Sequence, residues 1–184
     1  MNRRLAQGFP GDAAGRERPE TEAVVALGAN LGDRAETIAA AVRDLGRLPL
    51  TTAVRAADPI ESVAVTPDGP DASAPAYLNT VAVVSTRLAP SVLLGYLHAI
   101  EERHGRVRRE RWGDRTLDLD LITYGEVRSD GPALLLPHPR AAERDFVLAP
   151  WLALDPDAVL PGAGRVADLL AALRAGGDEG EGRA

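Results

Sequence analysis

The stretch YLNTVAVVSTRLAPSVLLGYLHAIEERHG, residues 77–105, decides the fold class because it joins a long strand to an amphipathic helix. Residues 77–86 are rich in Val and Thr, which favour β-structure. Pro90 stands at a favoured first-turn position, and the apolar residues that follow it keep helical spacing. Gly105 is a typical helix stop. We therefore predict a strand followed by a helix that runs to about His104.

The segment before this unit repeats the same order of elements. Residues 23–28 form a short apolar run that ends at a Gly, which predicts a buried strand. Either Asn30 or Asp33 can cap the helix that follows it. A second strand is expected within residues 51–63, and the three prolines of residues 66–75 predict a loop.

After the helix that ends near His104, residues 116–124 alternate with period two and predict another strand. The order is that of an α+β fold with a ferredoxin-like βαββαβ core, an antiparallel sheet with helices packed on it. An irregular C-terminal extension follows, with a helical stretch near 146–154 and a last helix around 166–174. The expected organisation is a disordered leader (1–22), a single domain (23–175) and a flexible tail (176–184).

Composition excludes several classes of chemistry. The chain has 184 residues, a formal net charge of −6 and no Cys, which excludes a disulfide scaffold and a thiol nucleophile. Lys is also missing, which excludes a P-loop, so any phosphate must be bound by Arg. The acidic balance disfavours a general binder of nucleic acid or membrane. Lacking a signal peptide and a membrane-spanning run, the sequence predicts a soluble cytoplasmic protein.

The pair Asp118 and Asp120 is the most informative chemical feature. On a strand, residues two apart point to the same face, roughly 6.5–7 Å apart. Two carboxylates so close repel each other unless a cation lies between them, and oxygen ligands select Mg²⁺ or a similar hard cation. The alternative is an edge strand with a solvated acidic face.

An Arg-rich segment directly precedes this pair. It carries Arg103, Arg106, Arg108, Arg109, Arg111 and Arg115. Guanidinium groups match phosphate oxygens in pairs and neutralise charge during phosphoryl transfer. A solvated charge run is the alternative, but the neighbouring Asp pair favours a metal–nucleotide site.

Other candidates are single side chains. Tyr77, Trp112 and Phe146 could enclose a flat ligand, and Asn79 could read its hydrogen-bonding edge. His138, in a Pro-His-Pro turn, could donate to a phosphate, and Arg144 could add a further contact. Each has a plain alternative, as an ordinary core aromatic or a turn residue without a role.

Several segments together resemble the 6-hydroxymethyl-7,8-dihydropterin pyrophosphokinase family, over about residues 24–160. The segments are GANL (28–31), YLN (77–79), GRVR (105–108), RWGDRTLDLD (111–120), PHPR (137–140) and RDFVLAPW (144–151). The family transfers a pyrophosphoryl group from ATP to the hydroxymethyl oxygen of the pterin and releases AMP, in folate biosynthesis. The resemblance therefore implies ATP and the pterin as substrates, and other folate-pathway enzymes as candidate partners.

The resemblance also implies residue roles. Asp118 and Asp120 would hold two Mg²⁺ ions, and Arg108, Arg111 and Arg115 would clamp phosphates. Glu101, Arg108, Leu121, His138 and Arg144 would lie at the ATP. The pterin would be bound by Thr66, Pro67, Tyr77, Asn79, Trp112 and Phe146.

Two alternatives remain from other classes. The βαββαβ order is also that of an RNA-recognition module, but the central strands carry two Asp where aromatic side chains would stack on bases. A catalytically inactive relative retained for binding is the other, because Gly69 replaces a bulky apolar residue expected against the pterin.

Overall fold

The structure, a computed structural model, describes residues 18–66, 69–71, 73–105 and 116–181. Its elements are β1 (Thr21–Ala29), α1 (Arg34–Gly46), β2 (Thr51–Ala56), β3 (Ile60–Ser62), β4 (Ala64–Thr66), β5 (Gly69–Asp71), β6 (Tyr77–Thr86), α2 (Pro90–Arg103), β7 (Asp118–Tyr124), β8 (Ser129–Gly131), β9 (Leu134–Leu136), the short 3₁₀ helix η1 (Ala141–Glu143), α3 (Asp145–Leu154), β10 (Val159–Leu160), β11 (Gly164–Arg165) and α4 (Val166–Glu181).

The main sheet has the strand order β2-β6-β1-β7, with β3 paired to the other end of β6. Neighbouring strands are antiparallel throughout, and β1 is hydrogen-bonded to β6 on one side and β7 on the other. Helix α1 links β1 and β2, which lie on either side of β6. Helix α2 links β6 and β7, which lie on either side of β1. The predicted α+β fold with a ferredoxin-like core is therefore confirmed.

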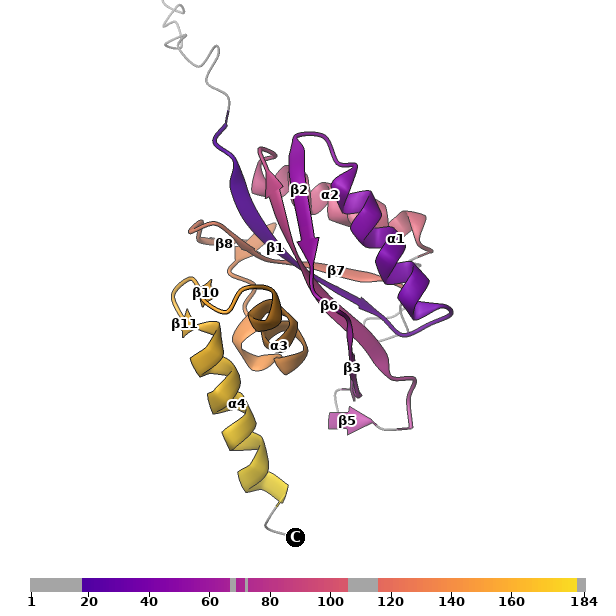
Figure 1. Cartoon of the computed structure of the whole chain (residues 1–184), viewed down its shortest axis with the longest axis vertical. Coiled ribbons are helices and arrows are strands. Elements are labelled where there is room, and N and C mark those ends of the chain that lie inside the picture. The colour runs from indigo at the N-terminus through magenta and orange to yellow at the C-terminus, as the bar shows by residue number, and fades with distance from the viewer. Residues whose placement is uncertain (1–17, 67–68, 72, 106–115, 182–184) are drawn as a thin grey trace, which may run out of the picture.

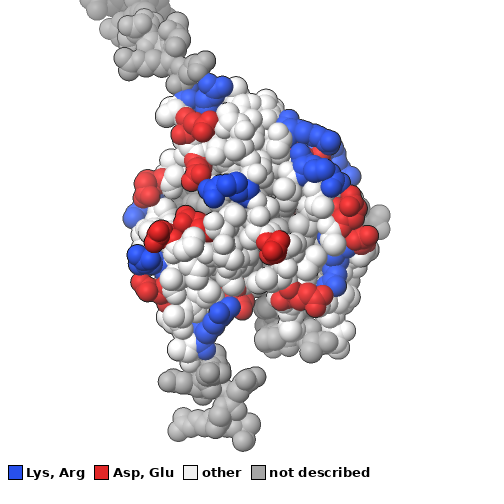
Figure 2. Space-filling view, viewed as in Figure 1, with Lys and Arg blue, Asp and Glu red and all other residues white. Residues whose placement is uncertain are grey.

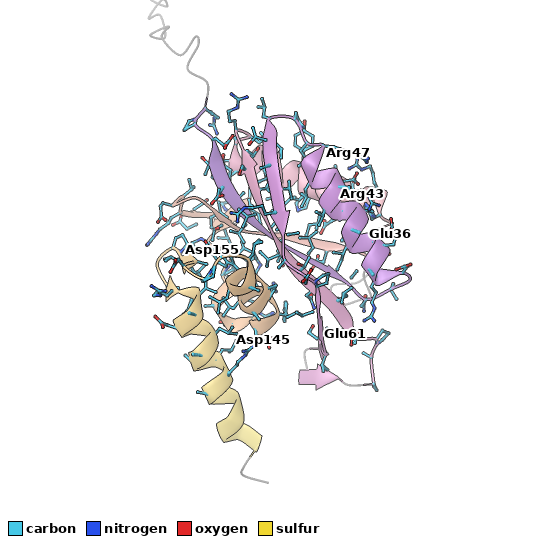
Figure 3. All side chains as sticks on the ribbon, in the orientation of Figure 1. Glu36, Arg43, Arg47, Glu61, Asp145 and Asp155 are labelled. Atoms are coloured by element: carbon cyan, nitrogen blue, oxygen red, sulfur yellow. The ribbon has the colours of Figure 1, made fainter. Side chains whose placement is uncertain are left out.

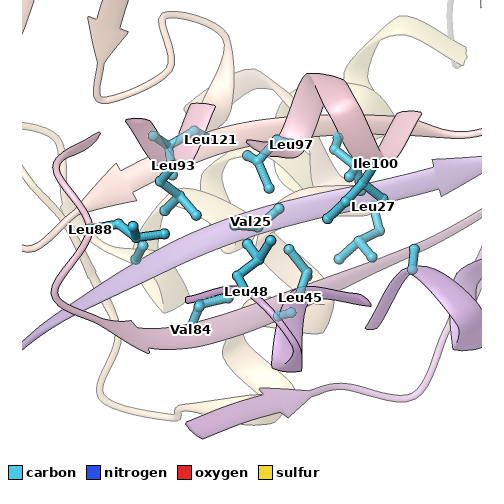
Figure 4. Packing of buried hydrophobic residues seen from close by; sticks show 14 of the residues in the cluster. Val25, Leu27, Leu45, Leu48, Val84, Leu88, Leu93, Leu97, Ile100 and Leu121 are labelled. Carbon is cyan, nitrogen blue, oxygen red and sulfur yellow. The ribbon is translucent and has the colours of Figure 1, made fainter. Parts of the chain in front are cut away.

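Helices α1 and α2 cover one face of the sheet (Figure 1). Alternate residues of the central strands, such as Val25 and Leu27, point to this side and pack against Leu45 of α1 and Leu97 of α2 (Figure 4). These side chains are almost completely removed from solvent. Side chains that recur every second residue on the strands and every 3.6 residues on the helices therefore meet in one apolar layer.

The opposite face is covered by the C-terminal extension. Val24 and Val83 point to this side and pack with Val147, Leu148 and Trp151 of α3. Helix α4 lies against α3 at the outer edge of this layer (Figure 1). The irregular extension is thus the second cover of the sheet.

Surface charge contributes little to this architecture. On the face shown in Figure 2, positive and negative side chains alternate around the margin. Ion pairs such as Arg43–Glu36, at 2.6 Å, and Arg165–Asp157, at 3.3 Å, are largely exposed. Such pairs contribute about 0–1 kcal/mol each, so the two apolar clusters carry the stability.

The start of α1 resolves one open alternative. Of the two predicted caps, Asp33 is the one used, because its Oδ1 accepts a hydrogen bond of 3.0 Å from the backbone N–H of Glu36. Asn30 is instead buried. A side-chain acceptor three residues before the donor satisfies one of the free N–H groups of the first turn.

Two predicted boundaries differ from the structure. The expected loop at 66–75 contains part of a short hairpin, β4 with β5, in which Val65 faces Pro70. Proline is compatible with a two-stranded ladder because every strand there is an edge. The last helix continues past Arg174 to Glu181, into the segment expected to be a flexible tail. Glycine costs about 1 kcal/mol in a helix interior relative to alanine, which by itself does not end a helix.

Within the described ranges, no helix combines the length and the apolar character needed to cross a membrane.

The buried side of α2 supplies a stability prediction. Leu93 is fully buried, whereas the neighbouring Val92 is 47% exposed. We expect Leu93→Ala to lower the free energy of unfolding by about 2–5 kcal/mol, because it leaves a cavity between α2 and the sheet. Val92→Ala, the matched control, should change it by less than about 0.5 kcal/mol. Urea unfolding followed by circular dichroism measures both, and equal losses would contradict the assigned packing.

Candidate active site

The register of β1 brings an amide and a carboxylate to either side of a glycine. Gly28 is directly opposite Asn79 of β6 and Asp118 of β7. Because strands lie about 4.8 Å apart, Asn79 and Asp118 are separated by roughly 10 Å along this row. A Cβ at Gly28 would be 2.9 Å from Oδ1 of Asn79 and 3.9 Å from the ring of Tyr77. The glycine therefore leaves a bare strip of backbone between two polar side chains.

The second carboxylate lies one row further along the same face. Asp120 is opposite Ala26, and both Asp118 and Asp120 are half-buried on the side of the sheet that α3 covers. The predicted same-face arrangement of the two carboxylates is therefore observed. Oδ2 of Asp120 accepts a hydrogen bond of 2.9 Å from Nη1 of Arg144, and Nε2 of His138 lies 3.8 Å from it.

Arg144 and His138 both belong to the C-terminal extension. The backbone N–H of His138 donates a 2.8 Å hydrogen bond to the carbonyl of Ile122, which attaches the turn after β9 to β7. Arg144 is the residue that precedes α3, and its guanidinium carbon is 5.7 Å from the centre of the Phe146 ring. A single guanidinium thus contacts both a carboxylate and an aromatic face.

The surroundings of His138 favour the neutral form of its ring. Burial lowers its pKa below the ordinary value of 6.5, and the guanidinium groups of Arg144 and Arg140 lower it further. Asp120, whose effect is second only to burial, and Asp118 raise the pKa without cancelling this decrease. The backbone N–H of Arg140 donates to Nδ1 of His138 at 3.2 Å, so the neutral ring carries its proton on Nε2, toward Asp120.

Two residues predicted to lie at the ATP have side chains on the other side of the sheet from the two aspartates. Glu101 is completely buried on the α2 side of the sheet, and its Oε1 accepts a 2.8 Å hydrogen bond from the backbone N–H of Leu119. It thereby holds the strand segment between the two aspartates. Leu121 is part of the core between the sheet and α1–α2, because its position on β7 has the opposite parity to Asp118 and Asp120.

The remaining predicted residues can be placed only in part. Tyr77, Asn79 and Phe146 are on the same side of the sheet as the two aspartates. Thr66 is the last residue of β4. Pro67, Arg108, Arg111, Trp112 and Arg115 lie outside the described residues.

Three residues of the site were not identified from the sequence. Gly28 stood in a motif without a role, and its place opposite Asn79 and Asp118 depends on strand register. Ser62 of β3 accepts a 2.7 Å hydrogen bond from Nδ2 of Asn79. Arg34 of α1 donates to the carbonyl of Ala76 at 2.7 Å, directly before Tyr77. In the sequence, the only signal for such contacts is a polar residue within an otherwise apolar strand.

The donor set at the aspartates is compatible with a hard divalent cation. In the described part of the chain, no group of three or more His, Cys, Asp or Glu side chains is arranged to hold a metal ion. Mg²⁺ commonly binds through one or two carboxylates and completes its octahedron with water and substrate phosphates. Asp118 and Asp120 match that pattern.

Comparisons with known proteins identify the family of this chain. A sequence model described as 7,8-dihydro-6-hydroxymethylpterin-pyrophosphokinase (HPPK) matches residues 24–156. The 2-amino-4-hydroxy-6-hydroxymethyldihydropteridine pyrophosphokinase of Pseudomonas aeruginosa is 47% identical over 148 residues, which is 80% of this chain and 89% of that protein. The Haemophilus influenzae protein of the same name is 38% identical over 149 residues, 80% of this chain and 90% of its own.

Solved structures share the fold. A crystal structure of Plasmodium falciparum HPPK-DHPS with pterin and p-hydrobenzoate has a TM-score of 0.67 at 13% identity. The match covers 90% of this chain and 46% of that one, so the present chain spans less than half of that protein. With the family model matched along most of the domain and close relatives matched over nearly their full length, this chain belongs to the 7,8-dihydro-6-hydroxymethylpterin-pyrophosphokinase family.

Proposed function

We propose that this pterin pyrophosphokinase transfers a pyrophosphoryl group from ATP to the hydroxymethyl oxygen of 6-hydroxymethyl-7,8-dihydropterin and releases AMP. The observation that carries the proposal is the row Asn79–Gly28–Asp118, with Asp120 one row further. An amide suited to a heterocycle and carboxylates suited to a metal-bound phosphate lie on one face, separated by bare backbone. Family membership supports the same reading.

The pterin half of the site would be formed around Asn79. This side chain is only 6% exposed, so a hydrogen bond to it forms away from bulk water and discriminates strongly between ligands. The half-buried rings of Tyr77 and Phe146 would contact the faces of the pterin. Gly28 keeps the strip below the ring free of side-chain atoms. Thr66, Pro67 and Trp112 would complete this half.

The phosphate half would be formed around the two aspartates. Asp118 and Asp120 would hold Mg²⁺, two ions in our proposal, which would neutralise negative charge on the ATP phosphates. Arg144 and His138 would donate to phosphate oxygens through Nη1 and Nε2, the atoms they now direct at Asp120. Arg108, Arg111 and Arg115 would clamp the phosphates from the segment between α2 and β7. Glu101 would act indirectly, from the α2 side of the sheet, by accepting the hydrogen bond that holds the backbone N–H of Leu119 in place.

The proposed reaction requires that the hydroxymethyl oxygen be positioned at the β-phosphorus and that the charge of the phosphates be neutralised. The hydroxymethyl oxygen forms a bond to the β-phosphorus, the bond from that phosphorus to the oxygen of the α-phosphate breaks, and AMP leaves with the electron pair. The hydroxyl proton is lost to solvent. A pterin over Gly28 and phosphates over the aspartates would bring these atoms together, which supplies much of the rate enhancement.

The first test is the product released. With ATP, Mg²⁺ and the pterin we expect AMP and the pyrophosphorylated pterin, and no AMP without the pterin. Asp120→Asn should lower turnover by at least about 100-fold, because it removes a charge that the transition state requires. Asp130→Asn, at an exposed position of β8, is the control and should be normal. Release of ADP, or full activity of Asp120→Asn, would overturn the assignment.

The Arg144–Asp120 ion pair predicts competition with a cation. Because Arg144 already neutralises Asp120, Arg144→Gln should tighten binding of Mn²⁺ alone by about threefold to tenfold, the range of a partly buried ion pair. The same change should weaken binding of the metal–nucleotide complex. Electron paramagnetic resonance of free Mn²⁺ measures the first effect. Arg140→Gln, which removes a nearby exposed charge, is the control, and weaker Mn²⁺ binding by Arg144→Gln would contradict the competition.

The lowered pKa of His138 predicts a pH effect on stability. In the metal-free protein, the His138 ring should titrate below pH 6.5 by NMR. As the pH falls below this value, the unfolded chain takes up the proton first, so stability should decline until the folded-state pKa is reached. His138→Gln should remove this part of the pH dependence between pH 7.5 and 5.5. A titration midpoint at or above 6.5 would refute the burial effect.

A further inference from the structure

The amide of Asn79 is held by a residue on a different strand. Its Nδ2 donates a 2.7 Å hydrogen bond to Oγ of Ser62, which is half-buried on β3. Ser62 is directly opposite Tyr77, and Asn79 is two residues further along β6 on the same face. With Nδ2 directed at Ser62, the carbonyl Oδ1 is the atom that lies over Gly28. In this arrangement the acceptor end of the amide faces the bare strip of backbone at Gly28.

Strand β3 is only three residues long, and a side chain from α1 fastens it. Nη2 of Arg34 donates to Oε1 of Glu61 at 2.9 Å, while Nη1 donates to the carbonyl of Ala76 at 2.7 Å. Glu61 directly precedes Ser62, and Ala76 directly precedes Tyr77. One guanidinium therefore bridges the two strands at the end where Ser62 meets Asn79.

The bridge acts from the opposite side of the sheet. Glu61 lies at the β3 end of the sheet, below α1, whereas Glu36 and Arg43 lie on α1 itself (Figure 3). Since alternate residues of a strand face opposite sides, the Arg34–Glu61 contact leaves Ser62 on the Asn79 side. A planar fork can satisfy two acceptors at a fixed spacing, which a lysine cannot do.

We propose that Ser62 is a positioning residue that orients the Asn79 carbonyl toward the ligand, and that Arg34 holds β3 so that Ser62 can do so. The site then presents a hydrogen-bond acceptor over Gly28 and selects planar heterocycles with an N–H group at that edge. The 2-amino group of the pterin is a donor of this class. The inference rests on the proposed function for the identity of this ligand.

Without the Ser62 hydroxyl, the amide of Asn79 can turn by 180° about its last torsion. Either end of the amide then faces the strip, and the acceptor is present for only part of the time. A ligand that needs the acceptor binds more weakly in proportion. The nucleotide half of the site, on the other side of Gly28, keeps its contacts.

Kinetics of Ser62→Ala test this role. We expect the KM for the pterin to rise about fivefold to tenfold, the effect of one hydrogen bond, with the KM for ATP within twofold of wild type. Ser62→Thr, which keeps the hydroxyl on a β-branched strand residue, should restore the pterin KM. Ser129→Ala is the matched control, because Ser129 makes an equally short 2.7 Å hydrogen bond in the β8–β9 hairpin. Equal increases in both KM values, or none, would overturn the proposal.

A ligand-free measurement separates this inference from the proposed function. In ¹⁵N NMR spectra, one Nδ2 proton of Asn79 should be shifted downfield in the wild type and in Ser62→Thr, and this shift should be lost in Ser62→Ala. An unchanged signal in Ser62→Ala would overturn the positioning role. Wild-type protein that shows the signal but neither binds nor turns over the pterin would instead overturn the proposed function.

The contribution of Arg34 is tested on the same helix. Arg34→Gln should raise the KM for the pterin severalfold and leave the KM for ATP unchanged, and Arg34→Lys should restore it only in part. Arg43→Gln breaks the exposed 2.6 Å pair with Glu36 and is the control. If Arg34→Gln and Arg43→Gln behave alike, Arg34 has no positioning role.

Discussion

Strand β1 is hydrogen-bonded on both edges, and its register with β6 and β7 decides which side chains meet at the site. A shift of β7 by one residue would turn Asp118 and Asp120 into the apolar layer below α2 and bring Leu119 to the surface. Burying two unpaired carboxylates costs several kcal/mol, so the alternation of Leu and Asp strongly opposes such a shift. Glu101 adds to this constraint because it accepts a hydrogen bond from the backbone N–H of Leu119. The candidate site is therefore a product of strand register.

Two like charges on one face also need a counterion, and a distant part of the chain provides it. Arg144 follows Asp120 by 24 residues, yet it contacts this carboxylate because α3 packs on the same face of the sheet. His138 is held near Asp120 because its backbone N–H donates a hydrogen bond to the carbonyl of Ile122 on β7. In the proposed reaction these groups serve phosphates, and without ligand they relieve the repulsion between the aspartates.

Much of the fold follows from periodicity. The spacing of apolar residues in 23–45 and 77–104 predicted strand and helix in the right order, and the alternation in 116–124 predicted the face of the two aspartates. The β4–β5 hairpin was missed because proline and glycine signal turns without indicating whether short strands flank them. Glu101 was predicted to lie at the ATP, and the structure buries its side chain under the sheet, where its helical spacing from Leu93 and Leu97 places it on the same face of α2.

The sequence by itself determined the βαββαβ order, the shared face of Asp118 and Asp120, and the family. These depend on local spacing and on short motifs, which the chain carries wherever it folds. Only the tertiary structure decided that Gly28 separates Asn79 from Asp118, that Ser62 and Arg34 support the Asn79 amide, and that Arg144 neutralises Asp120. Each of these contacts joins segments 17 to 90 residues apart along the chain. Such pairings depend on strand register and on packing across the sheet, which local sequence patterns do not encode.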